Sequence, residues 1–136
     1  MIDKEIIKIA SNTENHGMLN DHTHSSKLKN AICGDEMKIY LIVKDDKITN
    51  FKYECESCIY CQASVSLLSR NAKNKSIEKV KNFAKQAKNC FEKNNKSFDK
   101  EWKEFDKKMN KNNISRKECL LLPVNTTLDA LNKKSL

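Results

Sequence analysis

The sequence predicts an α+β fold in which a small antiparallel sheet of about three strands packs against helices. In the first half of the chain, β-rich runs carry apolar residues at every second position, whereas the second half carries apolar residues at helical spacing. The strands precede the helices rather than alternating with them. That order is typical of α+β architecture.

The N-terminal third is expected to hold a short helix, a loop and a hairpin. Isoleucines in residues 2–9 allow an amphipathic helix, and residues 12–24 are predicted to form a loop in which Gly17 adopts a positive φ. The alternating run 37–43 and the β-rich run 48–53 flank a polar connector of hairpin length. Because two strands alone are marginally stable, we expect a third strand within residues 19–32.

After Cys58 the apolar period becomes helical. Ser76 is predicted to cap a second helix with an apolar side from Val80 to Phe91, and Ser97 to cap a third. The third helix would bury one stripe as core, made of Phe98, Trp102, Phe105 and Met109.

The last helix is signalled by a capping box, in which Ser115 and Glu118 bond each other's backbone N–H groups. Pro123 lies within its apolar stripe, so we expect a kink there, with a helix start at Pro123 itself as the alternative. In either case Cys119 lies near the beginning of a helix.

The length and composition predict one domain over residues 1–136. No linker or internal repeat divides its 136 residues. No apolar run approaches the roughly 20 residues that span a bilayer, and the N-terminus lacks the apolar stretch of a signal peptide. We therefore expect a cytoplasmic protein without a membrane partner.

The charge balance is basic, with 26 Lys and Arg against 18 Asp and Glu and a net charge of +8. A basic chain suggests an acidic partner such as nucleic acid. However, only Arg70 and Arg116 carry the planar guanidinium that reads base edges, and the lysines are interspersed with acidic residues. A solvated lysine-rich surface is the preferred interpretation, and nucleic acid is not the expected partner.

Six cysteines are the most informative feature of the sequence. Without a signal peptide, a metal site or reactive thiols are favoured over disulfides. In Cys33-Gly34-Asp35, the glycine allows a tight bend that points a thiolate and a carboxylate the same way. Cys58 and Cys119 both fall where helices begin, which favours their thiolates. Cys90 lies on an apolar helix face and is predicted to be a buried core residue.

The segment from Cys55 to Cys61 has C-x2-C-x2-C spacing, which matches the opening of a ferredoxin cluster run. The run does not continue, because Val65 occupies the next position and no Cys-Pro follows. A thioredoxin-like redox pair is the alternative, although the preceding region lacks a βαβ pattern. His22 and His24 are expected to be surface residues rather than metal ligands.

As an ensemble, four motifs resemble the IscU/NifU-like iron–sulfur cluster assembly proteins, and within them the SufU type. The motifs are Asn15 to Asp21, Cys33-Gly34-Asp35, Cys58 to Ser64, and Arg116 to Cys119 with Leu122-Pro123. Their order and approximate spacing cover nearly the whole chain.

The resemblance implies that Cys33, Asp35, Cys58 and Cys119 are the metal ligands of a Cys3Asp site. It implies a three-stranded sheet with helices, a cysteine desulfurase as sulfur donor, and downstream assembly or acceptor apoproteins. Either a [2Fe–2S] cluster is built on the ligands, or zinc occupies them and the protein relays sulfur, at most as a zinc-dependent sulfurtransferase. Residues 81–113 are similar to the helical insertion of the SufU type.

The sequence also departs from the family at several positions. Ser57 stands where members have glycine, Cys61 where serine is common, and Cys55 has no counterpart. Glu118 replaces the histidine of scaffold members, which favours the sulfur relay.

The predicted function is persulfide acceptance for iron–sulfur cluster assembly, and Cys33 is the predicted acceptor because a glycine-containing loop moves more readily than a helix start. Arg116 and Lys117 are expected to offset the negative charge of the ligands. A structural zinc domain and a lysine-rich nucleic-acid binder are the alternatives.

Overall fold

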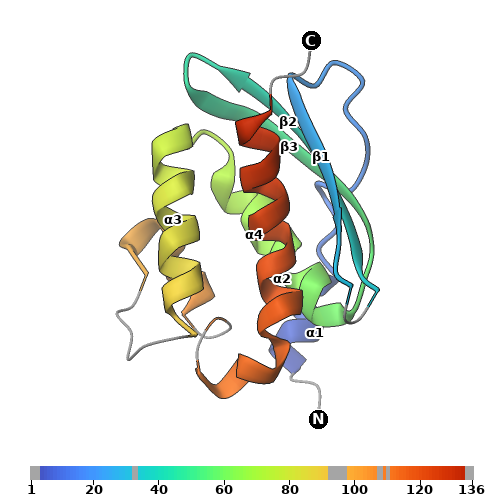
Figure 1. Ribbon diagram of the computed structural model, residues 1–136, viewed down its shortest axis with the longest axis vertical. Helices are drawn as coiled ribbons and strands as arrows, with labels where there is room; N and C mark the ends of the chain where they lie inside the picture. Colours follow the sequence, from blue (N-terminus) through green and yellow to red (C-terminus); the bar gives the residue numbers. More distant parts are fainter. Residues whose placement is uncertain (1–3, 32–33, 92–97, 107–108, 110, 134–136) are drawn as a thin grey trace.

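The computed structural model describes residues 4–31, 34–91, 98–106, 109 and 111–133. Within them the helices are α1 (Lys4–Ala10), α2 (Ile59–Ala72), α3 (Ile77–Asn89), the 3₁₀ helices η1 (Lys100–Phe105) and η2 (Lys111–Arg116), and α4 (Lys117–Asn132). The strands are β1 (His24–Lys29), β2 (Glu36–Lys44) and β3 (Lys47–Glu56). Figure 1 shows α2 and α4 against one face of the sheet and α3 beside α4. The α+β prediction is therefore confirmed.

The sheet is a three-stranded antiparallel meander in the order β1-β2-β3. Asp45 and Asp46 form the two-residue turn between β2 and β3, with φ of 52° and 61°. Positive φ at both positions matches the twist of a tight hairpin, and aspartate tolerates this conformation better than most residues. The third strand predicted within residues 19–32 is β1.

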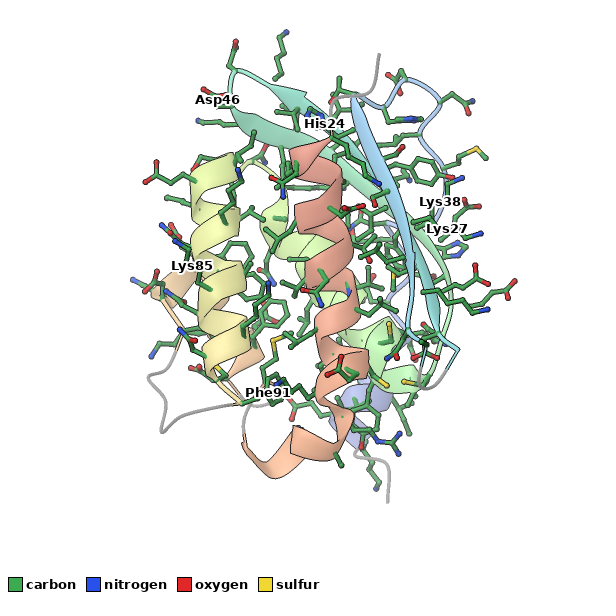
Figure 2. All side chains as sticks on the ribbon, in the orientation of Figure 1. His24, Lys27, Lys38, Asp46, Lys85 and Phe91 are labelled. Atoms are coloured by element: carbon green, nitrogen blue, oxygen red, sulfur yellow. The ribbon has the colours of Figure 1, made fainter. Side chains whose placement is uncertain are left out.

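One face of the sheet is apolar because its side chains alternate along each strand. Met37, Ile39 and Leu41 of β2 are fully buried, and their partners across the ladder include Tyr53 and Phe51 of β3. This face packs against α2 and α4 in a single core. Figure 2 shows Lys27 and Lys38 on the side of the sheet away from α4, and Lys85 pointing outward from α3.

The loop before β1 covers the outer edge of β3. The Tyr53 N–H donates to the Asn15 carbonyl at 3.1 Å, and the Gly17 N–H donates to the Tyr53 carbonyl at 2.8 Å. Gly17 has a φ of +142°, so its predicted positive φ is confirmed. The Asn15 side chain anchors the loop to α2, because its Nδ2 donates to Ser69 Oγ at 3.0 Å while its Oδ1 accepts from Lys73 Nζ at 2.6 Å.

Ser76 caps α3 as predicted, since its side chain accepts a hydrogen bond from the Lys79 N–H. Beyond α3, the sequence pattern predicted a third helix with an aromatic stripe. Its side chains are buried as expected, but the segment forms η1, and Trp102 has non-helical angles of φ −120° and ψ 16°. The prediction of a continuous α-helix over this stripe is therefore wrong. Its predicted cap, Ser97, lies outside the described residues.

Aromatic packing explains the short turns. Trp102 stacks on Phe83 of α3 with ring centroids 4.3 Å apart, and Phe98 and Phe105 pack on the same ring at 5.4 Å and 4.7 Å. Three rings gathered around one partner bury their apolar surface without a regular helix, so burial rather than helical propensity sets the backbone here.

The prediction of a capping box at the start of the last helix is wrong. Ser115 lies inside η2, which runs directly into α4, and the N-cap residue is Arg116 without a side-chain cap. The helix continues through Pro123 and does not start there. Cys119 is the third residue of α4, so the prediction of a cysteine at a helix beginning is confirmed. The expected kink at Pro123 stays a prediction.

Among the described helices, none combines the length and apolar character needed to cross a bilayer.

Replacing Phe83 with alanine should lower the free energy of unfolding by about 3–5 kcal/mol, because the cavity would remove the common partner of three aromatic rings. Urea unfolding followed by circular dichroism measures this. Lys85→Ala on the exposed side of α3 is the matched control and should change the free energy by less than about 0.5 kcal/mol. Equal losses in the two variants would contradict the packing described.

Candidate metal and sulfur site

Three side chains from distant parts of the chain meet where the sheet, α2 and α4 come together. One carboxylate oxygen of Asp35 and the sulfurs of Cys58 and Cys119 all lie within 4.8 Å of one another. Asp35 and Cys119 are buried and Cys58 is half-buried. Asp35 precedes β2, Cys58 precedes α2 and Cys119 lies in the first turn of α4, so each residue stands at the start of an element.

A tight bend between β1 and β2 positions Asp35. The Asn30 N–H donates to the Asp35 carbonyl, and the Gly34 N–H donates to the Asn30 carbonyl, both at 2.7 Å. Gly34 has a φ of +76°, and a Cβ placed there would meet no atom within 4 Å. Backbone conformation, rather than lack of space, therefore requires glycine at this position.

The Asp35 carboxylate is half satisfied. Its Oδ1 accepts a hydrogen bond from the Cys58 N–H at 3.2 Å, which links the bend to the N-terminus of α2. Its Oδ2 is buried and has no hydrogen-bond partner in the described part of the chain. A buried carboxylate oxygen without a partner is costly, so this atom is suited to a cation.

The helices hold the two cysteines in place. Cys58 is the N-cap residue of α2, with φ −69° and ψ 165°, and its carbonyl accepts the Gln62 N–H at 3.0 Å. Buried Ser64 Oγ donates to the Leu120 carbonyl at 2.7 Å, directly after Cys119. This bond fixes α2 against α4 and therefore the spacing between the two thiols.

The remaining residues singled out from the sequence have different positions. Cys33, the fourth predicted ligand and predicted acceptor, lies outside the described residues. The Arg116 guanidinium lies over the Tyr60 ring at 4.9 Å, a cation–π contact between the starts of α4 and α2. Lys117 is half-buried in the first turn of α4.

His22 and His24 are half-buried and have local partners. His22 Nδ1 is 2.7 Å from the Leu19 carbonyl, and His24 Nδ1 is 2.8 Å from Thr23 Oγ1.

Two further thiols, Cys55 and Cys61, are electrostatic neighbours of Asp35 and Cys58, and the sequence alone left their role open. Burial raises the pKa values of both Cys55 and Cys61, and the charge of Asp35 acts on each in the same direction. The buried Ser57 Oγ has no hydrogen-bond partner among the described residues. It lies close to both sulfurs and offsets part of the rise in their pKa values. The C-x2-C-x2-C spacing was the signal for this cluster.

The donor set fits a soft or borderline metal. Thiolates favour zinc and iron–sulfur clusters, and zinc also accepts a carboxylate oxygen as a ligand. Asp35 Oδ2 would supply an oxygen ligand without breaking any hydrogen bond within the described residues.

Comparison with known proteins gives the family. The model of the NifU-like N-terminal domain matches residues 1–96. The chain belongs to this NifU-like family. Over 135 residues it is 30% identical to the iron–sulfur cluster assembly scaffold protein IscU of Thermotoga maritima, covering 99% of this chain and 95% of that protein.

A second relative of the NifU-like chain has a different described activity. The zinc-dependent sulfurtransferase SufU of Bacillus subtilis is 31% identical over 74 residues, which cover 54% of this chain and 50% of that protein.

Solved structures share the NifU-like fold. The N-terminal part of a NifU-like protein from Brucella abortus superposes with a TM-score of 0.88 at 21% identity, covering 95% of this chain and 90% of that one. A SufU from Fervidobacterium islandicum, described as an iron–sulfur cluster assembly scaffold protein for the SUF system, superposes with a TM-score of 0.82 at 25% identity and covers 96% of both chains.

Cys90 provides a test of the burial that separates core thiols from the site. Burial raises its pKa to about 11, and the nearby charge of Asp106 adds to the effect. Below that pH most of the thiol is protonated and only its small thiolate fraction reacts, so its alkylation by iodoacetamide should rise about tenfold per pH unit between pH 8 and pH 10. Peptide mass spectrometry measures the rate. In urea the rate should instead level off near pH 9, and the same plateau in the folded protein would contradict the burial.

Proposed function

We propose that this chain is an iron–sulfur cluster assembly protein that accepts persulfide sulfur from a cysteine desulfurase at the Asp35, Cys58 and Cys119 site. The observation that carries the proposal is the convergence of these three donor atoms within 4.8 Å, from three separate elements. Membership of the NifU-like family and likeness to both an IscU scaffold and a SufU sulfurtransferase support it.

The metal would be held by Asp35, Cys58 and Cys119, with Cys33 as the proposed fourth ligand. A bound zinc ion would keep the thiols deprotonated and gathered at one point. In the scaffold alternative, a [2Fe–2S] cluster is the cargo assembled on the same residues and passed to acceptor apoproteins. The proposal treats residues 1–136 as one domain. Within it, Glu118 and a SufU-type insertion at residues 81–113 favour the zinc-bound relay.

Sulfur transfer requires a thiolate that reaches the donor's persulfide. The acceptor thiolate attacks the terminal sulfur, the donor's S–S bond breaks, and the desulfurase cysteine leaves as a thiolate. Cys33 is the proposed acceptor, because the adjoining Gly34 is exposed in a bend with positive φ. Arg116 and Lys117 near the start of α4 add positive charge close to the ligands. A cytoplasmic location belongs to the same proposal.

Serine substitutions test the sulfur-accepting role. Cys33→Ser, Cys58→Ser and Cys119→Ser should each reduce stimulation of a cysteine desulfurase to the level of the desulfurase alone, because a hydroxyl is neither a persulfide acceptor nor a comparable metal ligand. Cys90→Ser, at a buried thiol outside the site, should retain stimulation. Unchanged stimulation in all three site variants would refute the proposal.

Metal analysis of anaerobically purified protein separates the two forms of the function. A relay should contain about one zinc per chain, with four protein ligands, and no visible absorption. Iron with visible charge-transfer bands would contradict the zinc relay and support the scaffold.

A purely structural metal site is the second candidate, because the three ligands tie together the sheet, α2 and α4. This candidate would be supported if a chelator unfolded the chain and neither the wild type nor any variant stimulated a desulfurase.

A further inference from the structure

Cys61 is a thiol that the metal site does not use. It lies in the first turn of α2 and is fully buried, whereas Cys58, three residues earlier, is half-buried. The two residues form a Cys-x-x-Cys pair across the start of a regular 14-residue helix.

Helix geometry brings this pair within reach of a disulfide. Cα atoms three residues apart on an α-helix are separated by about 5 Å, inside the roughly 4.4–6.8 Å range that disulfides require. Side chains on a helix lean toward its N-terminus, so that of Cys61 points back over residue 58. The bond from the Gln62 N–H to the Cys58 carbonyl shows that this first turn is formed.

The environment makes the two thiols unequal. Cys58 is accessible enough to react with an incoming sulfur, while Cys61 is shielded from large reagents and reaches only its neighbours. This division of access suits an attacked thiol and a resolving thiol.

We propose that Cys61 is a resolving thiol that releases sulfide from a persulfide on Cys58. The inference rests on the proposed sulfur-accepting function and applies to sulfur that reaches Cys58 directly or from Cys33. The sulfur of Cys61 attacks the Sγ of Cys58, the bond to the terminal sulfur breaks, and that sulfur leaves with the thiol proton as hydrogen sulfide. The two cysteines lose two electrons to the departing sulfur and close a disulfide. An external dithiol must then reduce the disulfide before another cycle.

Cys55 is less suited to this role. It lies near the end of β3, opposite Met37, and the strand continues through Glu56. Cys55 lies in the strand and Cys58 caps the helix, so this pair does not share the helical turn that brings Cys61 within reach of Cys58. Cys55→Ser is therefore a matched control for Cys61→Ser.

The decisive experiment incubates the metal-loaded full chain with a cysteine desulfurase and cysteine, removes small molecules, and follows the protein without reductant. Wild type should lose its added sulfur atom as free sulfide, and its intact mass should end two hydrogen atoms below the reduced chain. Cys61→Ser and Cys61→Ala should keep the sulfur adduct and release no sulfide. Cys55→Ser and Cys90→Ser should behave as wild type.

A second arm avoids the desulfurase. A limiting amount of a chromogenic aromatic disulfide should yield two coloured thiols per reagent molecule in wild type, because Cys61 displaces the second, but only one in Cys61→Ser. Peptide mapping should locate the new disulfide within residues 53–70.

The two arms separate the possible failures. A sulfur adduct that decays equally fast in wild type and Cys61→Ser would overturn this inference and leave the proposed function intact. Two coloured thiols from Cys61→Ser would overturn it as well. If neither the wild type nor any variant acquires sulfur from the desulfurase while the second arm gives the expected yields, Cys58 and Cys61 form the disulfide but the proposed sulfur-accepting function is wrong.

Discussion

The site depends on how α2 and α4 pack on one face of the sheet. Both helices begin at the same end of the molecule, so their first turns deliver Cys58 and Cys119 to one place, and the bend before β2 brings Asp35 there. The buried hydrogen bond from Ser64 to the Leu120 carbonyl locks the two helices together one residue from a ligand. A donor cluster drawn from such distant positions exists only when this core is formed, which couples ligand spacing to tertiary packing.

Much of the fold followed from apolar periodicity. The alternation in residues 37–43, the helical period after Cys58 and the cap at Ser76 each reflect local physics, and the corresponding elements are present. Periodicity failed at the aromatic stripe, because apolar spacing reports which residues are buried and not which helix type buries them. Phe98, Trp102 and Phe105 gather around Phe83, which lies on a different element and was invisible to a local pattern.

The candidate site was harder to predict than the fold from local sequence patterns. Sequence spacing marked Cys58 and Cys61 as a group, but no spacing connects Cys58 to Cys119, and only the motif ensemble joined them. The capping box failed for a related reason: η2 continues into α4, so Ser115 is inside a turn and not at a helix boundary. The contact of Ser64 with the Leu120 carbonyl also required the tertiary structure, because a serine in an apolar helix face has many possible partners.

The loop that pairs with Tyr53 also has a consequence for association. An unpaired outer strand is a template on which foreign strands add, and this chain blocks that template with its own residues 15–17. The side chain of Asn15 anchors this loop to α2 through its hydrogen bonds with Ser69 and Lys73. If these bonds break, the backbone N–H and carbonyl of Tyr53 become available to a foreign strand, so the loop anchored by Asn15 protects this edge of the sheet from strand addition.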